Sequence, residues 1–303
     1  MLLDLRTIGW GPASRPTNRR TELFADWIEA QTLVAGVGNS VSKHEIVDRL
    51  EGTSLVADSD DGWVLVEDAF SVCRNREDQI GTGYPFSVSG NTIKFFDASK
   101  IAYVICLLIS LPEQLRSLRT TYPVEFRDIF EQLVAEALRF SMPRWDIYPT
   151  GWSSIAGKAG KGAIVGKIGE WILAKHCDPS VFPNANDAQV DIAAVRPFGD
   201  TRSAFPVMLG QCATGVTDWK SKACRPNLDR WQKAVQFSNH PTKLFAVPFA
   251  LDDESFWEAT VECSGLVLDR IRICADLPNL PQPLTEITSE WLERATVALP
   301  MAA

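Results

Sequence analysis

The sequence contains few of the side chains that build zinc sites or disulfides. Three histidines and seven cysteines are spread over 303 residues. A structural zinc site normally needs four closely spaced ligands, and no two cysteines form a C-x-x-C pair, so we expect neither a zinc site nor a disulfide framework. An odd number of isolated thiols is typical of a reducing compartment, and we therefore expect a cytoplasmic protein. The cysteines are Cys73, Cys106, Cys177, Cys212, Cys224, Cys263 and Cys274.

Long apolar segments are also lacking. The longest runs from Ile101 to Leu111. It is far shorter than the roughly 20 residues that cross a bilayer, and it fits a buried helix better. The first residues, Met1 to Arg6, lack the basic start and apolar centre of a secretory signal. We expect no association with a membrane.

Positive charge is in short supply as well. Lys and Arg number 30 against 38 Asp and Glu, which gives a net charge of −8. Nucleic-acid binding needs clustered cations, so this balance argues against a broadly basic surface. Basic residues nevertheless gather in 158–167 and 220–233, whereas acidic residues gather in 58–78 and 252–262. A local basic groove is therefore compatible with an acidic chain.

The first part of the chain reads as a mainly helical domain over residues 1–120. The length and the 46% hydrophobic content of the whole chain are compatible with one large or two modest domains. Apolar periodicity predicts a helix over 21–36, and Ser42 with Glu45 predicts a capping box at the start of the next helix. A strand is expected at 63–66, and a hairpin turning at Gly90-Asn91. Helices followed by strands in this order resemble a winged helix.

Residues 121–303 read as an α/β domain with a mixed central sheet flanked by helices. Two runs at 188–195 and 205–213 predict adjacent strands, and further strands are expected at 243–249 and 266–273. Helices are expected before, between and after these strands. Their predicted ranges are 126–140, 164–176, 228–237, a segment from 252, and 288–299.

The stretch from Ala188 to Lys222 holds the most informative polar residues. Asp191 interrupts an apolar run, where a carboxylate is costly unless it is paired or binds a metal. Gln211 ends the second run, and Lys220 and Lys222 follow it. A carboxylate is a hard oxygen donor, so we expect Mg²⁺ or Mn²⁺ as the bound ion.

At these residues the sequence resembles the PD-(D/E)XK, or restriction-endonuclease-like, nuclease superfamily. That family places an Asp on one strand, Glu or Gln with a Lys two residues later on the next strand, and a Glu on a preceding helix. The resemblance implies a metal site formed by Asp191, Gln211 and a helical glutamate. Glu131 lies at the edge of the apolar stripe of its helix and is preferred over Glu170, which lies roughly opposite its stripe. The resemblance further implies DNA as the partner and a role in restriction or anti-phage defence.

The sequence departs from the family at Ala213, where the motif lysine should stand. A methyl group carries no charge, so Lys222 is our first replacement for that lysine and Lys220 our second. The alternative is a nuclease fold that lost its activity and binds nucleic acid or a protein partner, including another copy of itself. Cys212 is expected to be a packed thiol, because no histidine lies in a partner pattern.

Overall fold

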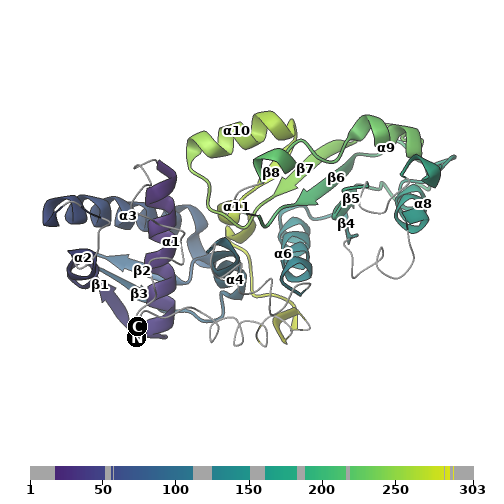
Figure 1. Ribbon diagram of the computed structural model, residues 1–303. Coiled ribbons are helices and arrows are strands. Elements are labelled where there is room, and N and C mark those ends of the chain that lie inside the picture. Colours follow the sequence, from purple (N-terminus) through teal and green to yellow (C-terminus); the bar gives the residue numbers. More distant parts are fainter. Residues whose placement is uncertain are drawn as a thin grey trace. The chain divides into compact units, whose positions relative to one another are not determined.

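The structure is a computed structural model that describes residues 18–51, 56, 58–111, 125–150, 161–182, 188–215, 219–282, 284–286 and 289 (Figure 1). The chain forms two compact units. The described residues up to 126, with 248–252 and those from 270 onward, form the first, and 127–247 with 253–269 form the second. The division expected from the sequence placed all of 121–303 in one domain. In the structure the chain instead returns twice to the first unit.

The first unit combines helices with a small antiparallel sheet. Its three strands lie in the order β1-β3-β2. The elements follow one another as helix, strand, helix, helix, strand, strand, and the likeness to a winged helix stays a prediction. The bounds are α1 Asn18–Ala35, β1 Ser40–Ser42, α2 Lys43–Glu51, α3 Ser59–Ile80, η2 Gly81–Gly83, β2 Phe86–Ser89, β3 Thr92–Phe95, α4 Ile101–Ser110 and α11 Arg270–Cys274.

Two local predictions in this unit are confirmed. Ser42 and Glu45 form a capping box, in which the Glu45 N–H donates to Ser42 Oγ at 3.2 Å and the Ser42 N–H donates to Glu45 Oε2 at 2.6 Å. The hairpin turns at Gly90, whose φ of 55° lies in the left-handed region that favours glycine. Strands β2 and β3 pair on either side of that turn.

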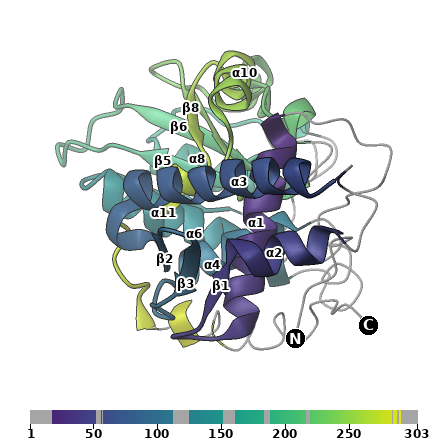
Figure 2. The same ribbon diagram turned by 90° about the vertical axis from the view of Figure 1, so that its left-hand side faces the viewer.

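The strand expected at 63–66 is wrong, because these residues belong to helix α3. Asp58 caps this helix by accepting a hydrogen bond from the Asp61 N–H at 3.0 Å. Val66, Phe70 and Cys73 are buried at helical spacing. Together they form one face of the helix, which packs against α1 (Figure 2). The four-residue window resembled a strand, whereas the longer periodicity is helical.

A fully buried ionic network lies inside the first unit. Arg270 of α11 makes two hydrogen bonds to Asp26 of α1, at 2.8 and 2.9 Å. Arg76 of α3 lies 2.8 Å from Asp26 and 3.0 Å from Glu29. Glu29 also accepts hydrogen bonds from Tyr84 and from Tyr103 of α4, each at 2.8 Å. Polar contacts thus join four helices, α1, α3, α4 and α11, that lie far apart in the sequence.

The second unit is built on a five-stranded mixed sheet in the order β4-β5-β6-β7-β8. Strands β4, β5 and β6 are antiparallel, and β7 and β8 then run parallel to β6. The predicted adjacency of the two strands around Asp191 and Gln211 is confirmed. The bounds are α6 Glu125–Ser141, β4 Asp146–Pro149, α8 Lys161–Trp171, η4 Pro179–Val181, β5 Ile192–Val195, β6 Val207–Cys212, η6 Lys220–Lys222, α9 Leu228–Ala234, β7 Thr242–Ala246, α10 Asp253–Cys263 and β8 Leu266–Leu268.

Helices flank this sheet, which confirms the predicted mixed α/β architecture. Ala193, Val195, Val207 and Leu209 lie at alternate strand positions and pack with apolar residues of α8 and α9. Helix α10 contacts β7 and β8. The last predicted strand, 266–273, is too long: β8 ends at Leu268, and α11 of the first unit begins at Arg270. The helix expected at 288–299 lies outside the described residues, apart from residue 289.

Candidate active site

Asp191 stands at the point where β5 enters the sheet. Its N–H donates to Gly210 and its carbonyl accepts from Thr150, both at 2.7 Å, so the backbone is held on each side. The register that pairs Ile192 with Gly210 places Asp191 directly opposite Gln211. The carboxylate oxygen Oδ2 accepts hydrogen bonds from the Gln211 side-chain amide and from the Cys212 N–H, the latter at 2.7 Å. The Asp191 side chain is therefore fixed by the neighbouring strand.

Glu131 reaches the same place from helix α6. The helix is amphipathic, and Phe130, Leu133 and Val134 bury its apolar face. Glu131 lies at the edge of that face and is only 8% exposed. Glu170 of α8, by contrast, is exposed and forms an ion pair with Lys167 at 2.8 Å. Of the two glutamates considered from the sequence, Glu131 is the one that interacts electrostatically with Asp191.

The carboxyl groups of Glu131 and Asp191 differ in their protonation state at neutral pH. Burial raises the pKa of Glu131 to about 9, and the charge of Asp191 adds to this rise. Burial also raises the pKa of Asp191 to about 6, although the Cys212 N–H and the cations Lys222 and Arg127 act against the rise. At neutral pH Asp191 is therefore ionised while Glu131 keeps its proton. Such a pair is the electrostatic situation that a bound cation relieves.

The two candidate lysines lie in different surroundings. Lys222 is close enough to favour the ionised form of Asp191. Lys220 forms an ion pair with Glu258 of α10 and lies 5.7 Å from the centre of the Trp219 ring. Both lysines belong to the short η6 turn. The turn thus directs one ammonium group to the carboxylate site and the other to helix α10.

Arg127 is a residue that the sequence analysis missed. Its positive charge lowers the pKa of both Glu131 and Asp191. It stands four residues before Glu131 on α6, and residues at this spacing lie on the same helix face. That spacing was visible in the sequence and could have identified it. Thr150, which is buried and holds the backbone beside Asp191, gave no comparable signal.

Gln211 and its neighbours on β6 shape the site rather than charge it. The Gln211 amide N–H₂ group faces Asp191 and orients that carboxylate. Ala213 is 1% exposed and its N–H donates to Ala246, so the position of the family's lysine is a buried methyl group. Burial raises the pKa of the Cys212 thiol well above its usual range, and Asp191 and Glu131 add to the rise. Cys212 is therefore a protonated thiol and no nucleophile at neutral pH.

The residues present fit a small divalent cation. The buried Glu131 and the half-buried Asp191 come from different elements and supply hard oxygen donors. The part of the chain that the structure describes contains no group of three or more His, Cys, Asp or Glu side chains placed to hold a metal. A cation here would accordingly be completed by water or backbone oxygens, which is usual for Mg²⁺.

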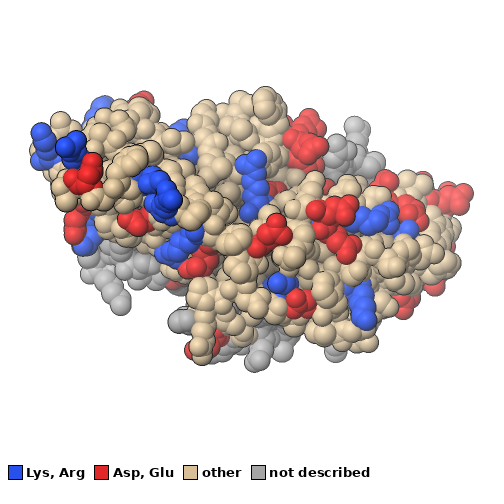
Figure 3. All heavy atoms as spheres, turned by 180° about the vertical axis from the view of Figure 1, so that it is seen from behind, with Lys and Arg blue, Asp and Glu red and all other residues tan. Residues whose placement is uncertain are grey.

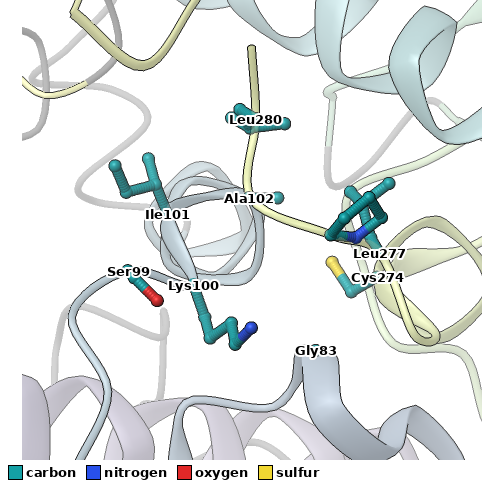
Figure 4. A pocket seen from close by; sticks show the side chains of 9 residues that line it. Gly83, Ser99, Lys100, Ile101, Ala102, Cys274, Leu277 and Leu280 are labelled. Atoms are coloured by element: carbon teal, nitrogen blue, oxygen red, sulfur yellow. The ribbon is translucent and has the colours of Figure 1, made fainter. Parts of the chain in front are cut away.

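A small cavity in the first unit has too little volume for an active site. It lies between the start of α4 and the segment from Cys274 to Leu280, and Lys100 and Gly83 line it (Figure 4). Its volume of about 10 Å³ holds about one water molecule. A Cβ on Gly83 would lie 1.9 Å from the carbonyl oxygen of Cys274, so only glycine fits this wall.

No described helix is both long and apolar enough to cross a membrane. No family model matches this chain, and the searches of curated proteins and of solved structures found no similar protein. The chemistry of the site therefore rests on its own residues.

Proposed function

We propose that this protein is a metal-dependent nuclease that cleaves DNA phosphodiester bonds. One observation carries the proposal: the carboxyl groups of Glu131 and Asp191 interact electrostatically, and Lys222 and Arg127 are close enough to act on the charge of Asp191. Paired carboxylates beside cations are the groups that phosphodiester hydrolysis with a divalent metal requires. On the face drawn in Figure 3, Lys and Arg side chains are scattered among Asp and Glu side chains.

The order of elements supports a restriction-endonuclease-like core. Helix α6 precedes three antiparallel strands, and helix α9 leads to β7, which runs parallel to β6. In this proposal Asp191 at β5, Gln211 on β6 and Glu131 on the preceding helix take the roles that the family resemblance implies. The order of elements supports the proposal independently of these three residues.

In this proposal each side chain has a distinct task. Bound Mg²⁺ or Mn²⁺ supplies positive charge that polarises a phosphoryl oxygen and lowers the pKa of water. Asp191 and Glu131 would hold the ion, and Gln211 keeps Asp191 in its orientation. Lys222 and Arg127 stabilise negative charge that develops on the phosphate, since preorganised cations act strongly in a site partly shielded from water. Lys222 thereby takes over the role of the missing lysine at Ala213.

A nuclease fold without activity is the second candidate, because Ala213 replaces the family's lysine with a buried methyl group. Such a protein would bind nucleic acid or a protein partner. It would not need the carboxyl pair to bind a metal, and this difference separates the two candidates.

Calorimetry and a cleavage assay test the proposal together. We expect wild-type protein to bind Mn²⁺ and to cut plasmid or linear DNA with Mg²⁺ or Mn²⁺. Asp191→Ala should abolish both. The fold should remain, because the Asp191 backbone keeps its hydrogen bonds to Gly210 and Thr150, although the Cys212 N–H loses its side-chain acceptor. Glu170→Gln is the matched control, since Glu170 is an exposed helical glutamate outside the site. Absence of both Mn²⁺ binding and cleavage of any DNA or RNA would favour the inactive candidate. Unchanged cleavage by Asp191→Ala would show that the assigned site is wrong.

A further inference from the structure

A groove on the second unit lies outside the carboxylate site. It runs between η6 and helix α10 and has a volume of about 540 Å³. Buried Trp219, Ala223 and Ala259 line it. Trp257 and Val261 stand one helical turn apart beside them and are 69% and 56% exposed. A largely exposed tryptophan beside a recess of this size is typical of a binding surface.

Negative charge accompanies this apolar strip. Helix α10 contains Asp253, Glu254, Glu258 and Glu262 but no Lys or Arg. Glu254, Glu258 and Glu262 recur every four residues and therefore form a stripe beside Trp257 and Val261. All three glutamates are exposed. Lys220, a cation that lines the groove, is already paired with Glu258.

The charge decides what kind of ligand fits. Nucleic-acid phosphates would meet the glutamate stripe and be repelled, whatever stacking Trp257 offered. A peptide that alternates apolar residues with Lys or Arg matches both features. Its apolar side chains would cover Trp219 and Ala259, and its cations would reach Glu262 and Glu254. An arginine could also stack on the Trp257 ring while a carboxylate binds its guanidinium.

We propose that the groove between η6 and α10 binds a basic amphipathic segment of a partner protein. The segment would lie along α10 in the manner of a helix in a groove, with apolar anchors at helical spacing. This proposal goes beyond the nuclease function and does not depend on it, because neither Asp191 nor Glu131 lines the groove.

Selection from a library of random peptides displayed on phage tests the proposal with the full-length protein. Peptides are selected on wild type after depletion on the double variant Trp257→Ala, Glu262→Gln. We expect the enriched peptides to combine Lys or Arg with apolar residues three or four positions apart. Enrichment of acidic or purely polar peptides would overturn the proposal, as would a failure to enrich any peptide on wild type.

An enriched peptide is then titrated by fluorescence anisotropy against single variants. Trp257→Ala and Glu262→Gln should each weaken binding by about tenfold or more, as expected for central residues of an interface. Phe198→Ala is the matched control for the tryptophan, because Phe198 is 68% exposed elsewhere on the same unit. Glu170→Gln is the control for the glutamate. Equal losses in test and control variants, or displacement of the peptide by duplex DNA, would rule out the assigned groove.

Discussion

At the scale of single residues, the decisive feature is that only one of the two carboxyl groups, that of Asp191, is ionised at neutral pH. Glu131 keeps its proton up to a pKa of about 9, whereas a free glutamate loses it near 4.5. The folded state thus binds a proton that the unfolded state has lost. Stability therefore falls as the pH rises from about 4.5 towards 9, because a raised carboxyl pKa penalises the folded protein across that window.

Glu131→Gln tests this prediction, since an amide imitates the protonated acid. Without metal, the variant should be more stable than wild type at about pH 8, by ~1 kcal/mol or more, and the two should converge near about pH 4. Thermal unfolding followed by circular dichroism at several pH values measures the difference. Glu170→Gln should follow wild type throughout. If the stability of Glu131→Gln varied with pH in parallel with that of wild type, the pKa of Glu131 would not be raised in the folded protein.

Lys222 and Lys220 should differ in their effect on cleavage. Lys222→Ala should lower the rate with Mg²⁺ by about a hundredfold, because it removes a cation that acts at the carboxylate site. Lys220→Ala removes an exposed ion pair with Glu258 and should change the rate little. Single-turnover cleavage assays compare the two variants. The opposite ranking would assign the lysine role to Lys220.

The sequence indicated candidate site residues where a polar side chain interrupts an apolar strand. Asp191 and Gln211 were found because a polar group inside an apolar run is conspicuous. Arg127 was missed, because a charged residue at the start of an amphipathic helix is ordinary until the helix is known to face a carboxylate. No pattern in the sequence could show that the Gln211 amide would orient Asp191, since this depends on the register between the two strands.

At the scale of elements, α11 is held to the first unit chiefly through Arg270. The helix has five residues, too few to be stable by itself. Its arginine is fully buried and contacts α1 through Asp26, α4 through Ser110, and the Pro248 carbonyl. The short helix is therefore fixed by charge and hydrogen bonds as much as by apolar packing.

Arg270→Met should lower the free energy of unfolding by about 3–5 kcal/mol, because it leaves the Asp26 carboxylate buried and short of one partner. Arg74→Met is the matched control, since Arg74 of α3 donates a hydrogen bond to the nearby Ser71 and is partly exposed. It should change stability by less than about 0.5 kcal/mol. Urea denaturation measures both. Similar losses in the two variants would refute a special role for the buried network.

Elements with a long apolar period were predictable, and short ones were not. Helices α1 and α6 show several turns of regular apolar spacing, and α4 is apolar on all sides; the predicted ranges of all three agree with the structure within a few residues. The start of α3 was mistaken for a strand because Trp63 to Val66 is short and apolar. The boundary between β8 and α11 was missed because the residues on both sides of it are buried, so no change of apolar period marks the end of the strand. Likewise, no local signal shows that the chain after Asp269 returns to the first unit.

At the scale of the whole molecule, the net negative charge would limit how the proposed nuclease binds DNA. A chain with charge −8 attracts phosphates only where cations gather. With Arg127 and Lys222 among a small number of contacts, the logarithm of the DNA association constant should fall with the logarithm of salt concentration with a slope of about −2 to −3. Fluorescence anisotropy with labelled duplex in EDTA measures this slope. A slope steeper than about −5 would reveal a larger basic surface than these residues provide.

The hydrogen bonds on Asp191 also bear on ion size. Its Oδ2 atom already accepts from the Gln211 amide and the Cys212 N–H. An ion that grips a carboxylate by both oxygens must displace those donors, whereas an ion that takes one oxygen need not. Ca²⁺ often coordinates in the first way and surrounds itself with six to eight oxygens, while Mg²⁺ keeps a compact octahedral shell rich in water. In the proposed nuclease, the strand that fixes Asp191 would therefore favour the smaller ion.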